Sequence, residues 1–149
     1  LLPDIALRGN FTLDSDGGFY CVNTAYMISS SDKYLMGILN SSLVTFFYKN
    51  ISSTYRGGYL RFIYQYLVTI PIPKINESDS RQKNISQSIT DSVSRIYEIK
   101  NRLSETRSPQ EKTLLDRQTE VLDRQIDQLV YQLYGLTDEE IRIVESGVS

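Results

Sequence analysis

Ser108-Pro109-Gln110-Glu111 stands between two long segments that each carry an apolar stripe on a polar background. Serine suits the N-cap position, proline suits the first helical position, and a glutamate three residues after the cap can reach back to it. The tetrapeptide therefore predicts the start of a helix. The apolar residues recur at helical spacing on both sides, as Ile85, Ile89, Val93, Ile96 and Leu103, then Leu115, Leu122, Ile126, Leu129 and Leu133. A short connection between two such stripes favours an antiparallel helical hairpin.

The end of the chain carries further helix signals. Gly135 can end the second long helix in a left-handed conformation, and Thr137-Asp-Glu-Glu140 offers a capping box for a short terminal helix. Neither stripe is stable alone in water. Each must bury its apolar face on the other, on the first half of the chain, or on another chain.

The first half of the chain predicts short strands around one helix. We expect strands near residues 3–7, 10–13, 19–28, 59–64 and 67–72. One helix is predicted from apolar residues at helical spacing, which are Leu35, Ile38, Leu39, Leu43, Phe46 and Phe47. Ser31 or Asp32 can cap its start. Gly37 and Asn40-Ser-Ser weaken this helix, so we expect it to bend there. The fold class expected is α+β, with a small mixed sheet and a bent aromatic helix, followed by an antiparallel α-helical hairpin and a short terminal helix.

Charge and aromatic residues divide the chain near Pro73. The net charge of the 149 residues is −2. Residues 1–75 hold six basic against four acidic residues and thirteen of the sixteen aromatic residues, whereas residues 76–149 hold ten basic against fourteen acidic residues. We therefore predict a recognition region at 1–75 and a helical hairpin with a tail at 76–149. Any polyanion should lie along the first region, because acidic helices repel phosphates.

Composition excludes several chemistries. The chain has no histidine, which removes the commonest general base and the commonest metal ligand, so we assign no catalytic residue and no metal ligand. The single cysteine, Cys21, allows no internal disulfide and reads as a small buried residue of a strand. No apolar run is long enough to span a bilayer, so we expect a cytoplasmic protein without membrane contact.

Two arginines and a glycine pair stand among tyrosines in residues 53–73. Gly57 and Gly58 can turn through positive φ or lie against a ligand, and Arg56 and Arg61 supply planar donor groups for phosphate oxygens or guanine. In a strand, Tyr59 and Arg61 would share one face, while Leu60 and Phe62 would share the other and enter the core. An exposed turn with solvated or paired arginines is the alternative.

Three further residues are weaker candidates for the same surface. Tyr55 adds a flat, hydroxyl-tipped side chain beside Arg56. Lys49 ends the aromatic helix, where compensation of the helix dipole explains a cation equally well. Arg8 lies between a strand and a turn and is a candidate for phosphate contact.

Several separated blocks also resemble a known family. They are Pro3-Asp-Ile-Ala, Asn23-Thr-Ala-Tyr, Asn40-Ser-Ser-Leu-Val-Thr-Phe-Phe-Tyr, Ile51-Ser-Ser-Thr-Tyr-Arg-Gly-Gly-Tyr-Leu-Arg-Phe, Ile70-Pro-Ile-Pro and Tyr134-Gly-Leu-Thr-Asp-Glu-Glu-Ile. In this order they resemble the C-terminal target-recognition (specificity) domain of TaqI-like adenine-N6 DNA methyltransferases and type IIG restriction-modification enzymes.

The resemblance implies sequence-specific recognition of double-stranded DNA, with catalysis elsewhere. In that family a separate domain binds S-adenosylmethionine and carries an Asn/Asp-Pro-Pro motif, which is absent here, so we expect no cofactor in this chain and interpret it as a fragment of a methyltransferase or of a methylase-nuclease fusion. The expected partners are duplex DNA, the missing methyltransferase domain and, through the hairpin, a second copy in a homodimer. The alternative is a protein-interaction or subunit-assembly module built on the helical hairpin, without DNA contact.

Overall fold

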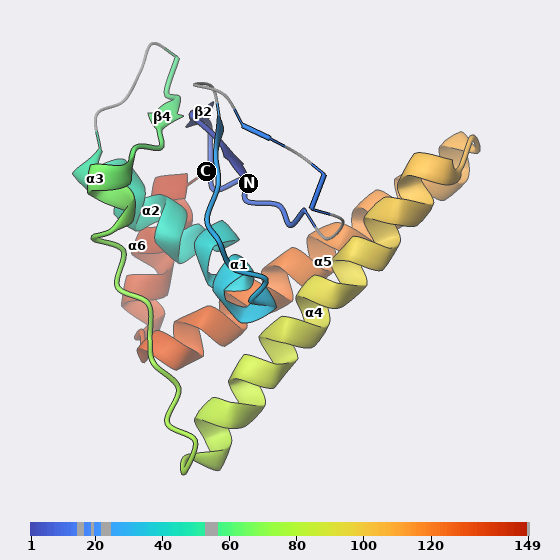
Figure 1. The fold of residues 1–149 in the computed structure, drawn as a ribbon. Coiled ribbons are helices and arrows are strands. Elements are labelled where there is room, and N and C mark those ends of the chain that lie inside the picture. Colours follow the sequence, from blue (N-terminus) through green and yellow to red (C-terminus); the bar gives the residue numbers. More distant parts are fainter. Residues whose placement is uncertain (15–16, 19, 22–24, 53–56, 149) are drawn as a thin grey trace.

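The computed structural model describes residues 1–14, 17–18, 20–21, 25–52 and 57–148. These residues form an α+β fold, as predicted from the sequence (Figure 1). Its elements follow in the order β1 (Leu2–Pro3), β2 (Ile5–Ala6), β3 (Ala25–Tyr26), α1 (Lys33–Asn40), α2 (Ser42–Ile51), β4 (Leu60–Arg61), α3 (Tyr64–Leu67), α4 (Ser80–Glu105), α5 (Pro109–Tyr134) and α6 (Asp138–Val148).

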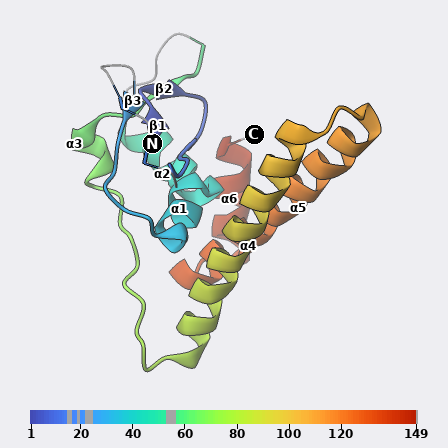
Figure 2. The same cartoon turned by 45° about the vertical axis from the view of Figure 1, so that its right-hand side comes forward.

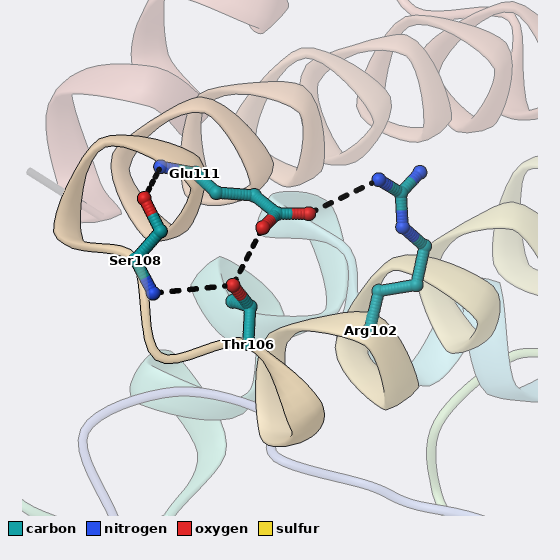
Figure 3. A network of polar contacts seen from close by, with 4 residues as sticks. All are labelled: Arg102, Thr106, Ser108 and Glu111. Atoms are coloured by element: carbon teal, nitrogen blue, oxygen red, sulfur yellow. Dashed lines mark hydrogen bonds and ion pairs between the residues drawn. The ribbon is translucent and has the colours of Figure 1, made fainter.

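Helices α4 and α5 form the predicted antiparallel hairpin, and the turn between them points away from the rest of the molecule (Figures 1 and 2). Ser108 caps α5 by accepting a hydrogen bond from the backbone N–H of Glu111 at 3.4 Å. The Glu111 carboxylate does not return to the cap directly. It accepts the Thr106 hydroxyl at 2.6 Å and contacts Arg102 at 3.3 Å, and the Ser108 N–H donates to Thr106 (Figure 3). These bonds lower the pKa of Glu111, chiefly through Thr106.

The predicted signals at the end of α5 and the start of α6 are confirmed. Gly135 adopts φ 70° and ψ 33°, and the N–H of Leu136 returns to the carbonyl of Tyr131. Thr137 and Glu140 form a complete capping box, in which the Glu140 carboxylate accepts the backbone N–H of Thr137 at 2.7 Å and the Thr137 hydroxyl accepts the N–H of Glu140. The bonds from Thr137 lower the pKa of Glu140.

The aromatic helix bends where the sequence predicted, and it does so as two helices. Ser41 ends α1 and caps α2, because its hydroxyl donates to the carbonyl of Ile38 at 2.7 Å and accepts the N–H of Val44. Asp127 of α5 accepts both the backbone N–H and the hydroxyl of Ser42 at 2.7 Å. Burial raises the pKa of Asp127, although both bonds from Ser42 oppose the shift. A carboxylate of the hairpin therefore stabilises the N-terminus of α2.

Gly37 lets α1 approach α4 closely. A Cβ at this position would lie 2.5 Å from a methyl group of Ile89 and 3.2 Å from one of Val93. The sequence identified Gly37 only as a weak point of the helix. In the fold it is the contact that brings α1 against the hairpin.

Within the described residues, the strands are short and form two separate two-stranded antiparallel sheets. Residues 19 and 22–24 of the strand expected at 19–28 lie outside the described residues. Strand β1 pairs with β3, and β2 pairs with β4. The strand expected at residues 10–13 is wrong, because side chains from the helices bond the backbone of Phe11 and Leu13, while Thr12 exchanges its backbone bonds with Leu1. The Asn40 amide accepts the N–H of Phe11 at 2.7 Å and donates to its carbonyl at 2.9 Å, and the Tyr97 hydroxyl accepts the N–H of Leu13.

The strand expected at residues 67–72 is also wrong. This segment continues from the helical turn α3 into turns and then an extended exit through Pro71 and Pro73. Proline cannot donate to a ladder, and two tyrosine hydroxyls bind the exit instead. Tyr134 donates to the carbonyl of Pro71 at 2.6 Å and Tyr34 to that of Pro73 at 3.0 Å. Burial is the main cause that raises the pKa of each tyrosine to about 12.

One continuous core joins the strands to the hairpin. Its buried residues come from both halves of the chain: Leu2, Phe11, Met36, Ile38, Leu39, Val44, Tyr48, Leu60, Phe62, Ile70, Ile85, Ile89, Val93, Ile126 and Val130. The division into regions 1–75 and 76–149 stays a prediction. None of the helices in the described ranges is long and apolar enough to cross a bilayer.

Candidate functional site

Strand β4 rests on a buried tyrosine. Tyr48 of α2 is fully buried, and its hydroxyl donates to the carbonyl of Arg61 at 2.8 Å and accepts the N–H of Ile63 at 3.1 Å. Its ring stacks on Phe62, with centroids 4.5 Å apart and planes at 19°, and Phe11 meets the edge of Phe62 at 6.0 Å. Phe62, between the two bonded positions, is thus held by a stacked ring and by an edge contact, and β4 has a buried support. The sequence did not single out this role of Tyr48.

The glycine pair before β4 has the backbone conformation that the sequence predicted. Gly57 adopts φ 85° and Gly58 adopts φ 80°, both in the left-handed region that favours glycine. Among the described residues, a Cβ at Gly58 would meet nothing within 4 Å, and one at Gly57 would meet the ring of Tyr59. The pair turns the chain into β4, and no described side chain lies close against Gly58.

Side chains alternate along β4 as predicted. Leu60 and Phe62 are buried, whereas Tyr59 is 42% exposed and the Arg61 side chain 49% exposed. The Arg61 Nε lies 3.6 Å from a carboxylate oxygen of Asp4. The backbone carbonyl of Asp4 also accepts the N–H of Phe62 at 2.7 Å. Arg61 is therefore oriented and partly neutralised, while half of its side chain stays accessible.

Strand β2 and the bend that follows it expose two apolar side chains. Ile5 is the cross-strand partner of Arg61, so the two side chains leave the sheet on one face. Ile5 is 42% exposed, and Leu7, two residues further along, is 56% exposed. We call the surface formed by Ile5, Leu7, Tyr59 and Arg61 the β2–β4 face. Period-two alternation in the segment 3–7 was the signal for Ile5 and Leu7, which the sequence reasoning missed.

The other proposed site residues are distributed differently. Arg56 and Tyr55 lie outside the described residues. Lys49 donates from its ammonium group to the backbone carbonyl of Gly147 at 3.0 Å, which ties the end of α2 to the end of α6. The structure does not bring Lys49 together with the residues of the β2–β4 face through any described contact.

Arg8 lines a cleft of mixed polar and apolar lining, about 460 Å³ in volume, between the N-terminal segment and the helices. Lys100 of α4 and Asp123 of α5 line the same cleft. Burial raises the pKa of Asp123, and the positive charges of Arg8 and Lys100 oppose that shift. Arg8 thus faces an acidic group of the hairpin as well as solvent.

An apolar groove of about 320 Å³ lies between α2, α6 and the exit segment. Its lining is apolar apart from Glu140 and the Tyr134 hydroxyl group: Leu43, Val44, Phe46, Phe47, Ile70, Pro71, Tyr134, Leu136, Glu140, Ile143 and Val144. Within the described ranges no group of three or more histidine, cysteine, aspartate or glutamate side chains could hold a metal ion.

The match to a protein family covers the strands and α1 to α3. Residues 1–72 match the family model of the TaqI-like C-terminal specificity domain, which confirms the resemblance expected from the sequence. The whole chain is also similar to the type II methyltransferase M.XhoI of Xanthomonas vasicola. The two are 27% identical over 147 residues, which are 97% of this chain and 22% of the relative. The chain therefore spans about a fifth of that relative's length. No solved structure matches it.

Proposed function

From the match of residues 1–72 to a specificity domain, we propose that this chain recognises a specific sequence in double-stranded DNA for an adenine-N6 methyltransferase of a restriction-modification system. That match is the observation that carries the proposal. In it, catalysis and the binding of S-adenosylmethionine belong to a linked methyltransferase region, and the whole protein acts in the cytoplasm.

The β2–β4 face supports the proposal through its geometry. Arg61 is exposed on strand β4 and Tyr59 directly before it, and the bonds of Tyr48 to the backbone of Arg61 and Ile63 hold this segment in place. A guanidinium group in this position can bind phosphate or a guanine edge, and no described side chain close against Gly58 keeps a ligand from the backbone.

The distribution of charge supports a duplex along the first half only. Residues 1–75 carry a net charge of +2 and residues 76–149 a net charge of −4. The acidic helices would repel phosphate groups. Because few basic residues are available, we expect weak binding with a shallow dependence on salt.

The test is selection of bound duplexes from a randomised pool, followed by titration of the selected duplex at two salt concentrations. Arg61→Ala, alone and combined with Arg56→Ala, should weaken binding about tenfold or more. Arg117→Ala on the exposed side of α5 is the matched control and should leave binding unchanged. Failure to enrich any sequence, or equal binding by the double variant, would contradict the proposal.

The apolar groove favours a second candidate function, a protein-interaction module without DNA contact. Its lining suits an apolar partner surface, and the hairpin exposes Leu114 and Val121, each 56% accessible, seven residues apart on α5. The homodimer expected through the hairpin stays a prediction, which the mass in solution tests. An apolar contact would be nearly insensitive to salt, whereas duplex binding weakens as salt increases.

A further inference from the structure

The β2–β4 face combines one guanidinium group with aliphatic side chains, which is an uncommon solvent face for a short antiparallel pair. Such pairs normally place polar residues on the exposed side. Here the opposite side already contributes to the core, since Leu60 is fully buried and Ala6 packs against the same cluster. The exposure of Ile5 and Leu7 is therefore not needed to build the core.

We propose that Ile5 and Leu7 contact the C5-methyl groups of thymines in the major groove, next to the phosphate or guanine that Arg61 binds. This inference rests on the proposed function and names how that site discriminates sequence. The thymine methyl is the apolar group on the major-groove edge of the base pairs, and aliphatic side chains recognise it by contact.

The register of the strands places the two kinds of contact side by side. Ile5 and Arg61 are directly opposite in the antiparallel pair, a position at which Cβ atoms lie about 5 Å apart. Neighbouring base pairs are separated by about 3.4 Å along the duplex axis, so one residue pair can reach adjacent steps. A two-stranded ribbon is also an element that the major groove admits.

Asp4 restrains the orientation of the Arg61 side chain. Its carboxylate lies 3.6 Å from the Arg61 Nε, and its own side chain is only 18% exposed. The carboxylate therefore restricts the guanidinium, while about half of the Arg61 side chain stays accessible.

The decisive experiment replaces each thymine of the selected duplex by uracil, which removes only the methyl group. With the unmodified chain, one or two replacements should weaken binding about three- to fivefold, the effect of one methyl contact. Ile5→Ala and Leu7→Ala should abolish that difference, so that thymine and uracil duplexes bind equally. Arg61→Ala should weaken both duplexes and keep the difference between them.

Val121→Ala is the matched control, because Val121 is as exposed as Leu7 but lies on the hairpin. It should leave the thymine preference intact. Circular dichroism establishes that each variant is folded. If Ile5→Ala unfolds the sheet, Leu7→Ser takes its place in the binding measurement.

The outcomes separate this inference from the proposed function. A selected sequence without thymine, uracil replacements without effect, or an unchanged preference in Ile5→Ala and Leu7→Ala would overturn the inference and leave DNA recognition standing. If this face binds a protein instead, the thymine preference should likewise be unchanged in Ile5→Ala and Leu7→Ala. Failure to select any duplex would overturn the proposed function together with the inference.

Discussion

The helices of residues 80–148 supply their own backbone hydrogen bonds, whereas the non-helical segments of residues 1–75 depend on side chains that the helices provide. Helices α4 and α5 each run for 26 residues between a side-chain cap and a defined end. The strands, in contrast, are two residues long within the part of the chain that the structure describes. Beside backbone bonds such as those of Thr12 with Leu1 and of Phe62 with Asp4, several bonds that hold the backbone around the strands come from the side chains of Asn40, Thr45, Tyr48, Tyr97, Tyr34 and Tyr134.

The difference teaches how a surface with little regular structure can be rigid. Short strands alone are marginally stable in water. Here the helical part acts as a template, and its tyrosine hydroxyls and amide groups replace the missing ladder partners. The strand region should therefore fail when these polar groups are lost, and the helical region only when its apolar contacts are lost.

The substitution with the largest expected effect on stability tests the apolar contacts of the helical region. Leu122→Asp places a carboxylate at a position of α5 that is 7% exposed, and should lower the free energy of unfolding by about 4 kcal/mol or more. Urea unfolding measures it. Val121→Asp, one residue earlier and 56% exposed, should change stability by less than about 0.5 kcal/mol. Similar values for the two variants would show that the stripe is not buried.

Gly37→Val tests the close contact of α1 with the hairpin. The new Cβ would lie 2.5 Å from Ile89, and overpacking of this kind costs about 3 kcal/mol. Thermal unfolding should show a lower melting temperature. Gly18→Val, at a position with open space around it, is the control. Stability equal to the control would mean that the two helices can separate without loss.

Tyr48→Phe removes the hydroxyl group that supports the strand region and keeps the aromatic ring. The ring stays on Phe62, but the carbonyl of Arg61 and the N–H of Ile63 lose their partner, at a cost of about 2 kcal/mol. Hydrogen exchange should increase at β4 more than in α5. Tyr64→Phe, at a tyrosine that is 76% exposed, should have no effect. Uniform loss of protection over both regions would argue against a separate dependence of the strands on side chains.

The smallest expected effect concerns Asp127, which joins the two regions at Ser42. Burial raises its pKa, so the folded chain holds this proton more tightly than the unfolded chain. Its contribution to stability is complete below an unfolded pKa of about 4 and is lost as the pH rises through the folded value. Asp127→Asn keeps an acceptor for the Ser42 N–H and should reduce this loss of stability with rising pH.

Urea unfolding between pH 4 and pH 7 measures the Asp127 effect. Asp116→Asn, at an exposed carboxylate of the same helix, is the control and should follow the unmodified chain. A steeper loss of stability in Asp127→Asn would contradict the assignment.

The sequence predicted the helical region closely because its signals are local. The cap at Ser108, the left-handed Gly135 and the capping box at Thr137 each depend on residues within one turn. The predictions of strands at residues 10–13 and 67–72 were wrong because the conformation of these segments depends on residues far away in the sequence. Asn40 lies 29 residues from Phe11, and Tyr97 lies 84 residues from Leu13.

The candidate site was predictable in part for the same reason. Alternation along β4 correctly separated the buried Leu60 and Phe62 from the exposed Tyr59 and Arg61. Pairing of β2 with β4 joins residues 56 positions apart, so it could not be read from either segment, and Ile5 was missed. The contact of Lys49 with Gly147 spans 98 residues and was equally invisible.

Tyr34 and Tyr134 hold two carbonyls of one short segment from two different helices. The passage from strands to hairpin is thereby clamped rather than hinged. A displacement of the hairpin should therefore move the segment through Pro71 and Pro73 with it, and the strand region should follow rather than pivot about this segment.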